Sequence, residues 1–532
     1  MRIVIIFIKV RNLAIDLFAL LFIGLSVGCT LGIVSNLFVK GVAAATNLRK
    51  TLFSDSIISS FTPIISLLIA AVIIILIRKV FNITRWHGPP DAILAAHQSN
   101  NSIDVKRGLG STLTAFVSAS GGASVGQYGP LVHFGATVAT FLENFTSKRL
   151  PPGIFIGCGV AAAISAGFNA PIAGLVFAHE AVLRHFSLRA GGAIAISSIT
   201  ASTIGSGVFK ETLGLKIISD APPLIEIVPI VLICSPIFGV LAIFFMYSIR
   251  LGGKVSKASR LSPSYQILFA ALICGSIGLF VPEILGLGTN EMNNIFANQY
   301  EIVFLFIILI GKVFMTSLCI GFGFFGGIFA PALYVGAAGG GFIANSLIIM
   351  GFSLSLPALA LAGTAAVGAV AIGAPIATTL IILEFTGSYE FAVAAMIAVQ
   401  VSTFMAHRLY GDSLFDMALN DRGFKIGLGR QHIQMNDIPL SKILSSEALT
   451  FNENLKIKDV NLQMLNKEVT EAVVINSHNK YIGKISIYDI LRTSLNHKTT
   501  IKGLIKDTHL VLDSKISLVE SIEEASNFVG EF

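Results

Sequence analysis

Two glycine-rich turns, each running into a proline, contain the residues whose types and spacing could do chemistry. The first is Gly126–Pro130, with Tyr128 at its centre, and the second is Gly326–Pro331. Glycine lets the backbone turn sharply and lets a ligand approach it closely, and proline is tolerated at a helix start because its missing N–H would be unpaired there. Helix N-termini present free N–H groups and a positive dipole end, both of which favour anions. The two turns therefore predict a site in which backbone groups bind a small anion.

The turns belong to a pattern that occurs twice in the chain. Ala-Pro-Ile-Ala begins at Ala170 and again at Ala374, and in each copy six residues separate it from a glutamate, Glu180 or Glu384. The segments after the two turns also resemble each other, Pro-Leu-Val-His-Phe-Gly-Ala against Pro-Ala-Leu-Tyr-Val-Gly-Ala. Two pairs of matches in the same order predict two related halves. Where broken helices of two such repeats meet, a substrate site is expected near the middle of a membrane.

The composition indicates what kind of elements must position these turns. The chain has 532 residues, of which 54% are hydrophobic and only 13% charged, and its mean hydropathy is +0.79. Soluble globular chains are about 25% charged, and a helix of about 20 apolar residues spans a bilayer. Apolar runs of that length include Leu17–Val39, Ile227–Phe245 and Ile302–Ile320. The sequence therefore predicts a polytopic α-helical membrane protein, and no removable signal peptide is expected at its start.

A change in sequence character divides the chain into two domains. Residues 1–430 are apolar and rich in glycine and alanine, and the two related halves are expected at about residues 15–210 and 225–425. In residues 437–532, short runs of alternating polarity flank a hairpin-type connection at Ser477–Lys480. This pattern predicts a small soluble α+β tail, which we expect on the cytoplasmic side.

The sequence resembles the CLC family of chloride channels and chloride/proton exchangers over roughly residues 15–430. The resemblance is carried by the strings Gly126–Pro130, Phe168–Gly174 and Gly326–Pro331. It implies a homodimer of two independent pores, each within one subunit, and inverted repeats of tilted and partly broken helices in every subunit. It also implies chloride or a similar small inorganic anion as the substrate.

The residue at the outer gate of the family's exchangers differs in this chain. In those exchangers the first turn reads Gly-Lys/Arg-Glu-Gly-Pro, and its glutamate competes with chloride and carries protons; Tyr128 stands at that position here. A phenol, whose unperturbed pKa is about 10, is a poor proton carrier at neutral pH. The inner proton-transfer glutamate corresponds to Ala181, although a shift of one residue in the comparison would match it to Glu180. Both exchanger carboxylates are therefore expected to be missing.

The side chains that ligate the anion in the family differ as well. The serine of the family's Gly-Ser-Gly-Ile-Pro motif is replaced by His87, and the ligand tyrosine by Phe415, with Tyr410 as the alternative partner. An imidazole N–H can donate to an anion or bond a neighbouring helix end, whereas phenylalanine has no hydroxyl. The predicted anion-binding and pore positions are His87, Gly88, Gln127, Tyr128, Gly129, Ile328, Phe329 and Phe415.

The tail resembles a CBS (cystathionine-β-synthase-type) module. Ser486 and Asp489 match the module's Ser/Thr-x-x-Asp pattern, whose acid contacts ribose in nucleotide-binding members. An adenine nucleotide is therefore a candidate ligand of the tail. Residues 501–527 resemble the start of a second copy that is incomplete or divergent.

Three functions are compatible with these residues. The leading prediction is passive conduction of chloride or a similar small anion, by a channel or an uncoupled transporter, and it depends on Tyr128 and Ala181. The second is a chloride/proton antiporter whose proton groups have moved. Its available titrating residues are His87, His133, His179 and Glu180. The third is a nucleotide-sensing membrane protein that conducts little. No enzyme motif, metal-ligand spacing or nucleic-acid partner is predicted, and the leading function requires no cofactor.

Overall fold

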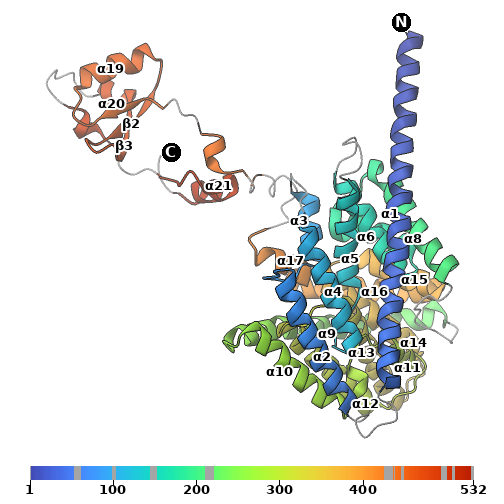
Figure 1. The fold of residues 1–532 in the computed structure, drawn as a ribbon. Coiled ribbons are helices and arrows are strands. Elements are labelled where there is room, and N and C mark those ends of the chain that lie inside the picture. Colours follow the sequence, from blue (N-terminus) through green and yellow to red (C-terminus); the bar gives the residue numbers. More distant parts are fainter. Residues whose placement is uncertain are drawn as a thin grey trace. The chain divides into compact units, whose positions relative to one another are not determined.

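The computed structural model describes residues 2–52, 61–98, 103–143, 152–209, 221–424, 435, 438–444, 448–492, 500–505 and 510–528. They belong to two compact units, Met1–Phe424 and Lys425–Phe532 (Figure 1). The first unit contains the long apolar helices and the second is the tail, and each is described by itself. Residue 437, where the tail was predicted to start, and residues 506–509 of its predicted second copy lie outside the described residues.

The described part of the first unit is helical. Its main helices in chain order are α1 (Arg2–Leu52), α2 (Thr62–Val80), α3 (Pro89–His97), α4 (Val105–Gly121), α5 (Tyr128–Glu143), α6 (Pro152–Phe168), α7 (Pro171–Phe177), α8 (Leu188–Phe209), α9 (Leu224–Ala258), α10 (Pro263–Gly278), α11 (Thr289–Phe296), α12 (Ile302–Gly321), α13 (Phe329–Ile349), α14 (Leu356–Ile372), α15 (Pro375–Thr386), α16 (Tyr389–Leu409) and α17 (Leu414–Asn420). Helices suit such a chain because in lipid they satisfy every backbone group within one segment.

Long and short helices alternate in this unit. Seven described stretches are long and apolar enough to cross a membrane: Leu17–Arg49, Thr62–Val80, Ala190–Phe209, Leu224–Ala258, Ile302–Gly321, Phe329–Ile349 and Tyr389–Asn420. Others, such as α3 with nine residues and α7 with seven, are too short to span. The short helices end inside the packed unit, so their termini are available to build a site there.

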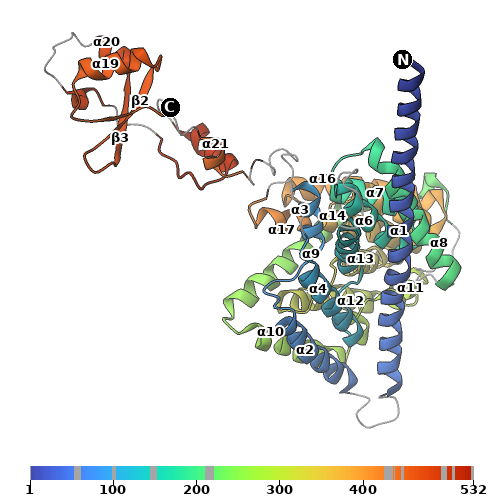
Figure 2. The same ribbon diagram turned by 45° about the horizontal axis from the view of Figure 1, so that its top comes forward.

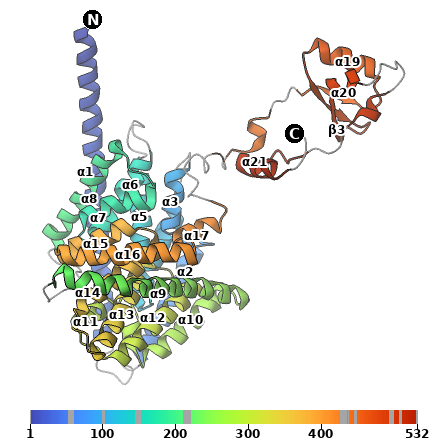
Figure 3. The same ribbon diagram turned by 180° about the vertical axis from the view of Figure 1, so that it is seen from behind.

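Each half packs largely on itself, and the two halves also contact each other. In the first half α1 packs along α8 and α6, and in the second half α9, α13, α14 and α16 pack on one another (Figure 3). Helix α2 of the first half packs against both α4 and α10 (Figure 2).

One pair of glycines in each half lets two helices approach closely. Gly135 of α5 meets Gly159 of α6, and Gly336 of α13 meets Gly363 of α14; a Cβ added to any of the four would overlap the carbonyl oxygen of its partner. Small residues at such crossings are typical of membrane helices. Because Gly135 and Gly336 occupy matching places in the repeat, the two halves use the same packing device.

The repeated glutamates connect the two halves to each other. The Glu180 carboxylate accepts hydrogen bonds from the backbone N–H groups of Ile376 (2.9 Å) and Ala377 (2.8 Å) at the start of α15. Its counterpart Glu384 accepts from Ile172 (2.9 Å) and Ala173 (2.8 Å) at the start of α7. Each carboxylate therefore caps the helix N-terminus of the other half, where the dipole favours a negative charge.

The second unit is a small α+β fold. Its three-stranded sheet has the order β1 (Thr450–Asn452), β2 (Glu471–Ile475), β3 (Tyr481–Ser486), with β1 parallel and β3 antiparallel to β2. Helices α19 (Ile457–Asn466) and α20 (Ile487–Arg492) contribute Val460, Met464 and Ile490 to its core, and α21 (Leu518–Asn527) follows later in the chain. Strands β2 and β3 form the hairpin expected around Ser477–Lys480.

Candidate anion pathway

The two glycine-rich turns meet inside the membrane unit. Gly126 and Gly327 exchange both backbone hydrogen bonds, at 2.7 and 2.6 Å. A Cβ at Gly126 would lie 2.9 Å from the Gly327 carbonyl oxygen, and a Cβ at Gly327 would lie 2.7 Å from the Gly129 nitrogen. Glycine is therefore required at both positions, because the backbones approach too closely for any side chain. Helices α5 and α13 start directly after this contact, so their N-termini face a common region.

A third helix start joins the two turns. Helix α3 begins at Pro89, and the Asp91 carboxylate accepts a hydrogen bond from the Gly88 N–H at 2.9 Å while the Asp91 N–H donates to the Gly88 carbonyl, also at 2.9 Å. This reciprocal arrangement caps the helix and fixes the preceding loop. The loop and the start of α5 are 40 residues apart in sequence, and α13 starts 201 residues after α5, so only the fold brings the three together.

A pocket of about 340 Å³ lies where the three helix starts converge. Five of the predicted anion-site residues line it: Gly88, Gly129, Ile328, Phe329 and Phe415. Its wall also includes Arg250, Asp421 and Arg422. Arg250 pairs with Asp421 at 3.1 Å and Arg422 pairs with Asp91 at 3.0 Å, so both arginines of the wall are ion-paired.

The position of Phe415 separates the two candidates for the second side-chain ligand. Phe415 is buried in α17 and lines the pocket. Tyr410, the alternative, follows the last residue of α16 as its C-cap and does not line this pocket. The pocket wall therefore carries an aromatic ring without a hydroxyl at this point.

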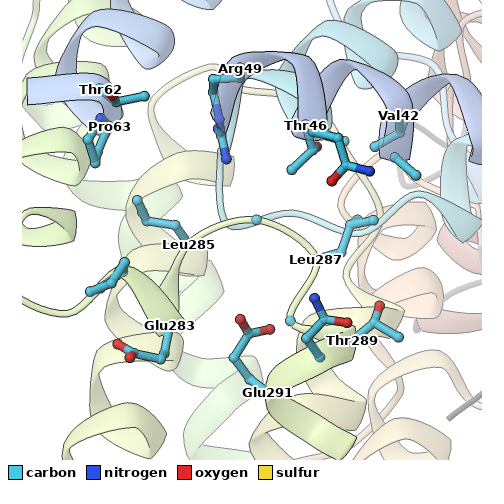
Figure 4. Close-up of a pocket in the computed structure, with 17 residues that line it drawn as sticks. Val42, Thr46, Arg49, Thr62, Pro63, Glu283, Leu285, Leu287, Thr289 and Glu291 are labelled. Carbon is cyan, nitrogen blue, oxygen red and sulfur yellow. The ribbon is translucent and has the colours of Figure 1, made fainter. Parts of the chain in front are cut away.

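A larger pocket, of about 750 Å³, was not predicted from the sequence. Its lining includes Arg49 of α1 and the carboxylates of Glu283 and Glu291 (Figure 4). Figure 4 shows the side chains of Arg49 and Glu291 directed toward the same space. Leu287 and Thr289 line both this pocket and a small cavity of about 20 Å³ that also contacts Tyr128. The large pocket and the small cavity therefore share part of their lining next to Tyr128.

Tyr128 lines the small cavity. Its ring stacks on Phe168 with centroids 3.8 Å apart and is almost fully buried. The adjoining cavity has room for about one water molecule. Gly129, the next residue of the same turn, lines the 340 Å³ pocket, so the turn lies between the two pockets. Gln127, which lines the small cavity, is buried and its side-chain oxygen has no hydrogen-bond partner.

The predicted ligand His87 faces away from the 340 Å³ pocket. Its neighbours Trp86 and Gly88 line that pocket, whereas the His87 ring packs against the His133 ring of α5 with centroids 6.0 Å apart. The backbone N–H of His87 donates to the Ser111 hydroxyl at 3.1 Å. Donation from His87 to an anion stays a prediction.

His133 is an unusual residue of this region. It is fully buried, and neither ring nitrogen has a hydrogen-bond partner. An unsatisfied buried polar group costs about 1–3 kcal/mol, so such a residue in a native fold calls for an explanation. From the sequence alone, His133 is predicted only as a titrating residue, because its spacing from His87 does not indicate that the two rings meet.

The predicted inner proton position is apolar. Ala181 is fully buried in the π-helical segment Ala178–Leu183 that follows α7. Its neighbour Glu180 uses both carboxylate oxygens to cap α15.

The predicted nucleotide residues of the tail lie close together in sequence and structure: Ser486 ends β3 and Asp489 is in the first turn of α20.

Comparisons with known proteins agree with this architecture. The family model described as voltage gated chloride channel matches residues 69–407. The chain is 28% identical over 444 residues to the H⁺/Cl⁻ exchange transporter ClcA of Vibrio cholerae serotype O1, which covers 79% of this chain and 92% of that protein. It is 26% identical over 363 residues to the voltage-gated ClC-type chloride channel ClcB of Escherichia coli, covering 66% and 85% of the two chains.

A solved structure supports the same fold. The structure of a slow cyanobacterial Cl⁻/H⁺ antiporter matches with a TM-score of 0.68 and 21% identity, over 76% of this chain and 97% of that one. The predicted CLC-like membrane fold is thereby confirmed. Because the family model covers more than half of the residues, the chain is an integral membrane protein that belongs to the voltage-gated chloride channel (CLC) family.

Proposed function

We propose that this protein moves chloride, or a similar small inorganic anion, passively across the membrane, as a channel or as a transporter uncoupled from protons. The observation that carries the proposal is the buried Tyr128 ring, which lines the small cavity directly before Gly129 of the 340 Å³ pocket. In the family's exchangers a carboxylate at this position carries protons, and a phenol is a poor carrier at neutral pH.

A second position supports the absence of proton coupling. Ala181 has no titrating group, and the neighbouring Glu180 is engaged as a helix cap. Both carboxylate oxygens of Glu180 are occupied by backbone N–H donors, so proton uptake there would disrupt the cap of α15. The chain therefore has no carboxylate at Tyr128 or Ala181, which match the two positions that carry protons in the family's exchangers.

Flux from liposomes tests the proposal directly. The purified chain is reconstituted with a chloride gradient, and chloride release and internal pH are followed together, with Vibrio cholerae ClcA as the exchange control. We expect chloride release under a potassium shunt without coupled proton movement. Sustained uphill proton movement driven by the chloride gradient would contradict the proposal.

A second candidate is a chloride/proton antiporter with relocated proton groups, and one observation favours it. The unpartnered His133 ring lies beside the His87 ring near the pocket wall, and imidazole is the side chain whose ordinary pKa is closest to neutrality. The relative ClcA is itself named as an exchanger. If this candidate is correct, His133→Gln should abolish proton movement and preserve chloride movement.

The tail and the assembly of the protein stay separate proposals. If a nucleotide binds at Ser486 and Asp489, ATP should protect the tail from proteolysis. Such protection without any anion flux would favour a sensor that conducts little.

The homodimer implied by the family would place apolar side chains against a partner. Exposed examples on α7, α15 and α16 are Ile172, Ile376, Met396 and Phe404. Crosslinking in membranes would test this assembly.

A further inference from the structure

Three potential metal ligands converge beside the loop that lines the 340 Å³ pocket. His87, Asp91 and His133 each offer one ligand atom, and these atoms all lie within 4.8 Å of one another. His87 precedes α3, Asp91 is in its first turn and His133 is in the second turn of α5. Among the residues that the structure describes, these three are the histidine, cysteine and carboxylate side chains that lie close enough together to hold a metal ion.

The two imidazoles are well suited to hold an ion. Both histidines are buried, and both ring nitrogens of His133 lack any hydrogen-bond partner. The space around His133 is restricted, since a Cβ added to Gly108 would lie 2.8 Å from the His133 Cε1 atom. A restricted ring with unused nitrogens next to a second imidazole is the arrangement that a metal ion would complete.

We propose that His87, His133 and Asp91 form a binding site for a divalent transition-metal ion such as zinc. Imidazole nitrogen and carboxylate oxygen are both ordinary zinc ligands, and a site with three protein ligands keeps one position open for water or another small ligand. Magnesium and calcium are disfavoured because they require oxygen ligands. Two zinc ligands lie roughly 3.3 Å apart in a tetrahedral site, so a small rotation of the rings from their present spacing completes the site.

Asp91 orients the site and contributes the weaker ligand. Its Oδ1 atom already pairs with Arg85 at 2.7 Å and with Arg422 at 3.0 Å, and its Oδ2 atom accepts from the Gly88 N–H. A carboxylate has about four acceptor positions, so these contacts leave roughly one for a metal. The two guanidinium groups lower the affinity of this oxygen for a cation, and the histidines therefore provide most of the binding.

A bound ion would connect the 340 Å³ pocket to α5. It would tie the loop residues Trp86–Gly88, two of which line the pocket, to α5, the helix that begins at Tyr128. We expect metal binding to fix this loop and reduce anion flux. The effect on flux rests on the proposed anion transport, whereas the binding itself does not.

Metal binding by the purified full-length protein tests the site without any transport measurement. After removal of metal with a chelator, zinc is titrated in competition with a chromophoric chelator, and cobalt is followed by its visible absorption. We expect one strong site per chain, weakened at least tenfold by His133→Gln and by His87→Ser, and less by Asp91→Asn. His407→Gln, which removes an exposed histidine on α16, should leave binding unchanged.

The control for folding is the melting temperature and elution profile of each variant without metal. A serine occupies the His87 position in the resembling family, so His87→Ser provides a variant expected to fold even if His133→Gln does not. Equal zinc affinity in the wild type and in a folded His87→Ser chain would overturn the proposal. If binding is lost in the variants but zinc does not change the flux of the wild type, the site is retained and its effect on transport is refuted.

Discussion

The two halves of the membrane unit share a scaffold and differ in chemistry. In both halves a glycine turn precedes a helix, and that helix crosses its neighbour at a pair of glycines. In both halves a glutamate also caps a helix of the other half. The first half has Tyr128 in its turn and His133 shortly after it, whereas the second turn is apolar and Tyr334, with the buried Lys312 over its ring, stands at the place of His133. Repetition therefore preserved the packing, and the two halves carry different side chains next to their turns.

We expect the glycine crossings of the two halves to be equally sensitive to substitution. Leucine at Gly135 or Gly336 forces a side chain into the facing carbonyl group, and we expect each variant to lose about 3 kcal/mol or more and most of its folded yield. Size-exclusion profiles and melting temperatures in detergent measure this. The matched controls are Gly207→Ala in α8 and Gly253→Ala in α9, where a Cβ meets no neighbouring atom. A normal yield of only one glycine variant would show that the halves are not equivalent.

Removing either cross-half cap should have a smaller but equal effect. Glu180→Gln and Glu384→Gln each replace a charged acceptor of two backbone N–H groups by a neutral one, and we expect a loss of about 1–3 kcal/mol in each case. Thermal unfolding in detergent compares them. A loss confined to one glutamate would indicate that this residue has a role beyond the shared scaffold.

The chemistry should change in the first half alone. Tyr128→Glu places a carboxylate at the predicted gate position, and we expect anion flux to become pH-dependent. Flux should rise as the pH falls, because the protonated acid no longer competes with the anion. Liposome flux measured across a pH series tests this, with Tyr128→Gln as the uncharged control. The same flux at every pH in Tyr128→Glu would show that this residue lies outside the pathway.

The smallest expected change concerns the pocket wall. Phe415→Tyr returns a hydroxyl donor to the anion pocket, and one hydrogen bond of about 0.5–1.5 kcal/mol should tighten chloride binding roughly two- to tenfold. Isothermal titration with chloride measures this. Tyr410→Phe, at a residue that does not line this pocket, should leave the affinity unchanged; an effect from Tyr410 alone would reverse the assignment.

Much of the fold was predictable because repetition and composition are local properties of the sequence. Long apolar runs with few charges determine membrane helices, glycine followed by proline marks helix starts, and the doubled Ala-Pro-Ile-Ala strings identify two halves. The replacement of the exchangers' gating carboxylate by Tyr128 is likewise predicted from one position, because the glycines and the proline of the turn are present, and it stays a prediction.

Only the tertiary structure decided which of these residues meet. The contact between Gly126 and Gly327, the caps that Glu180 and Glu384 exchange, and the pairing of His87 with His133 join segments that the sequence keeps apart. Side-chain direction is also a tertiary property: Phe415 faces the pocket and His87 turns from it because of how α17 and α5 pack. The sequence determines residue types and helix ends, whereas distances across the fold depend on packing that no local pattern encodes.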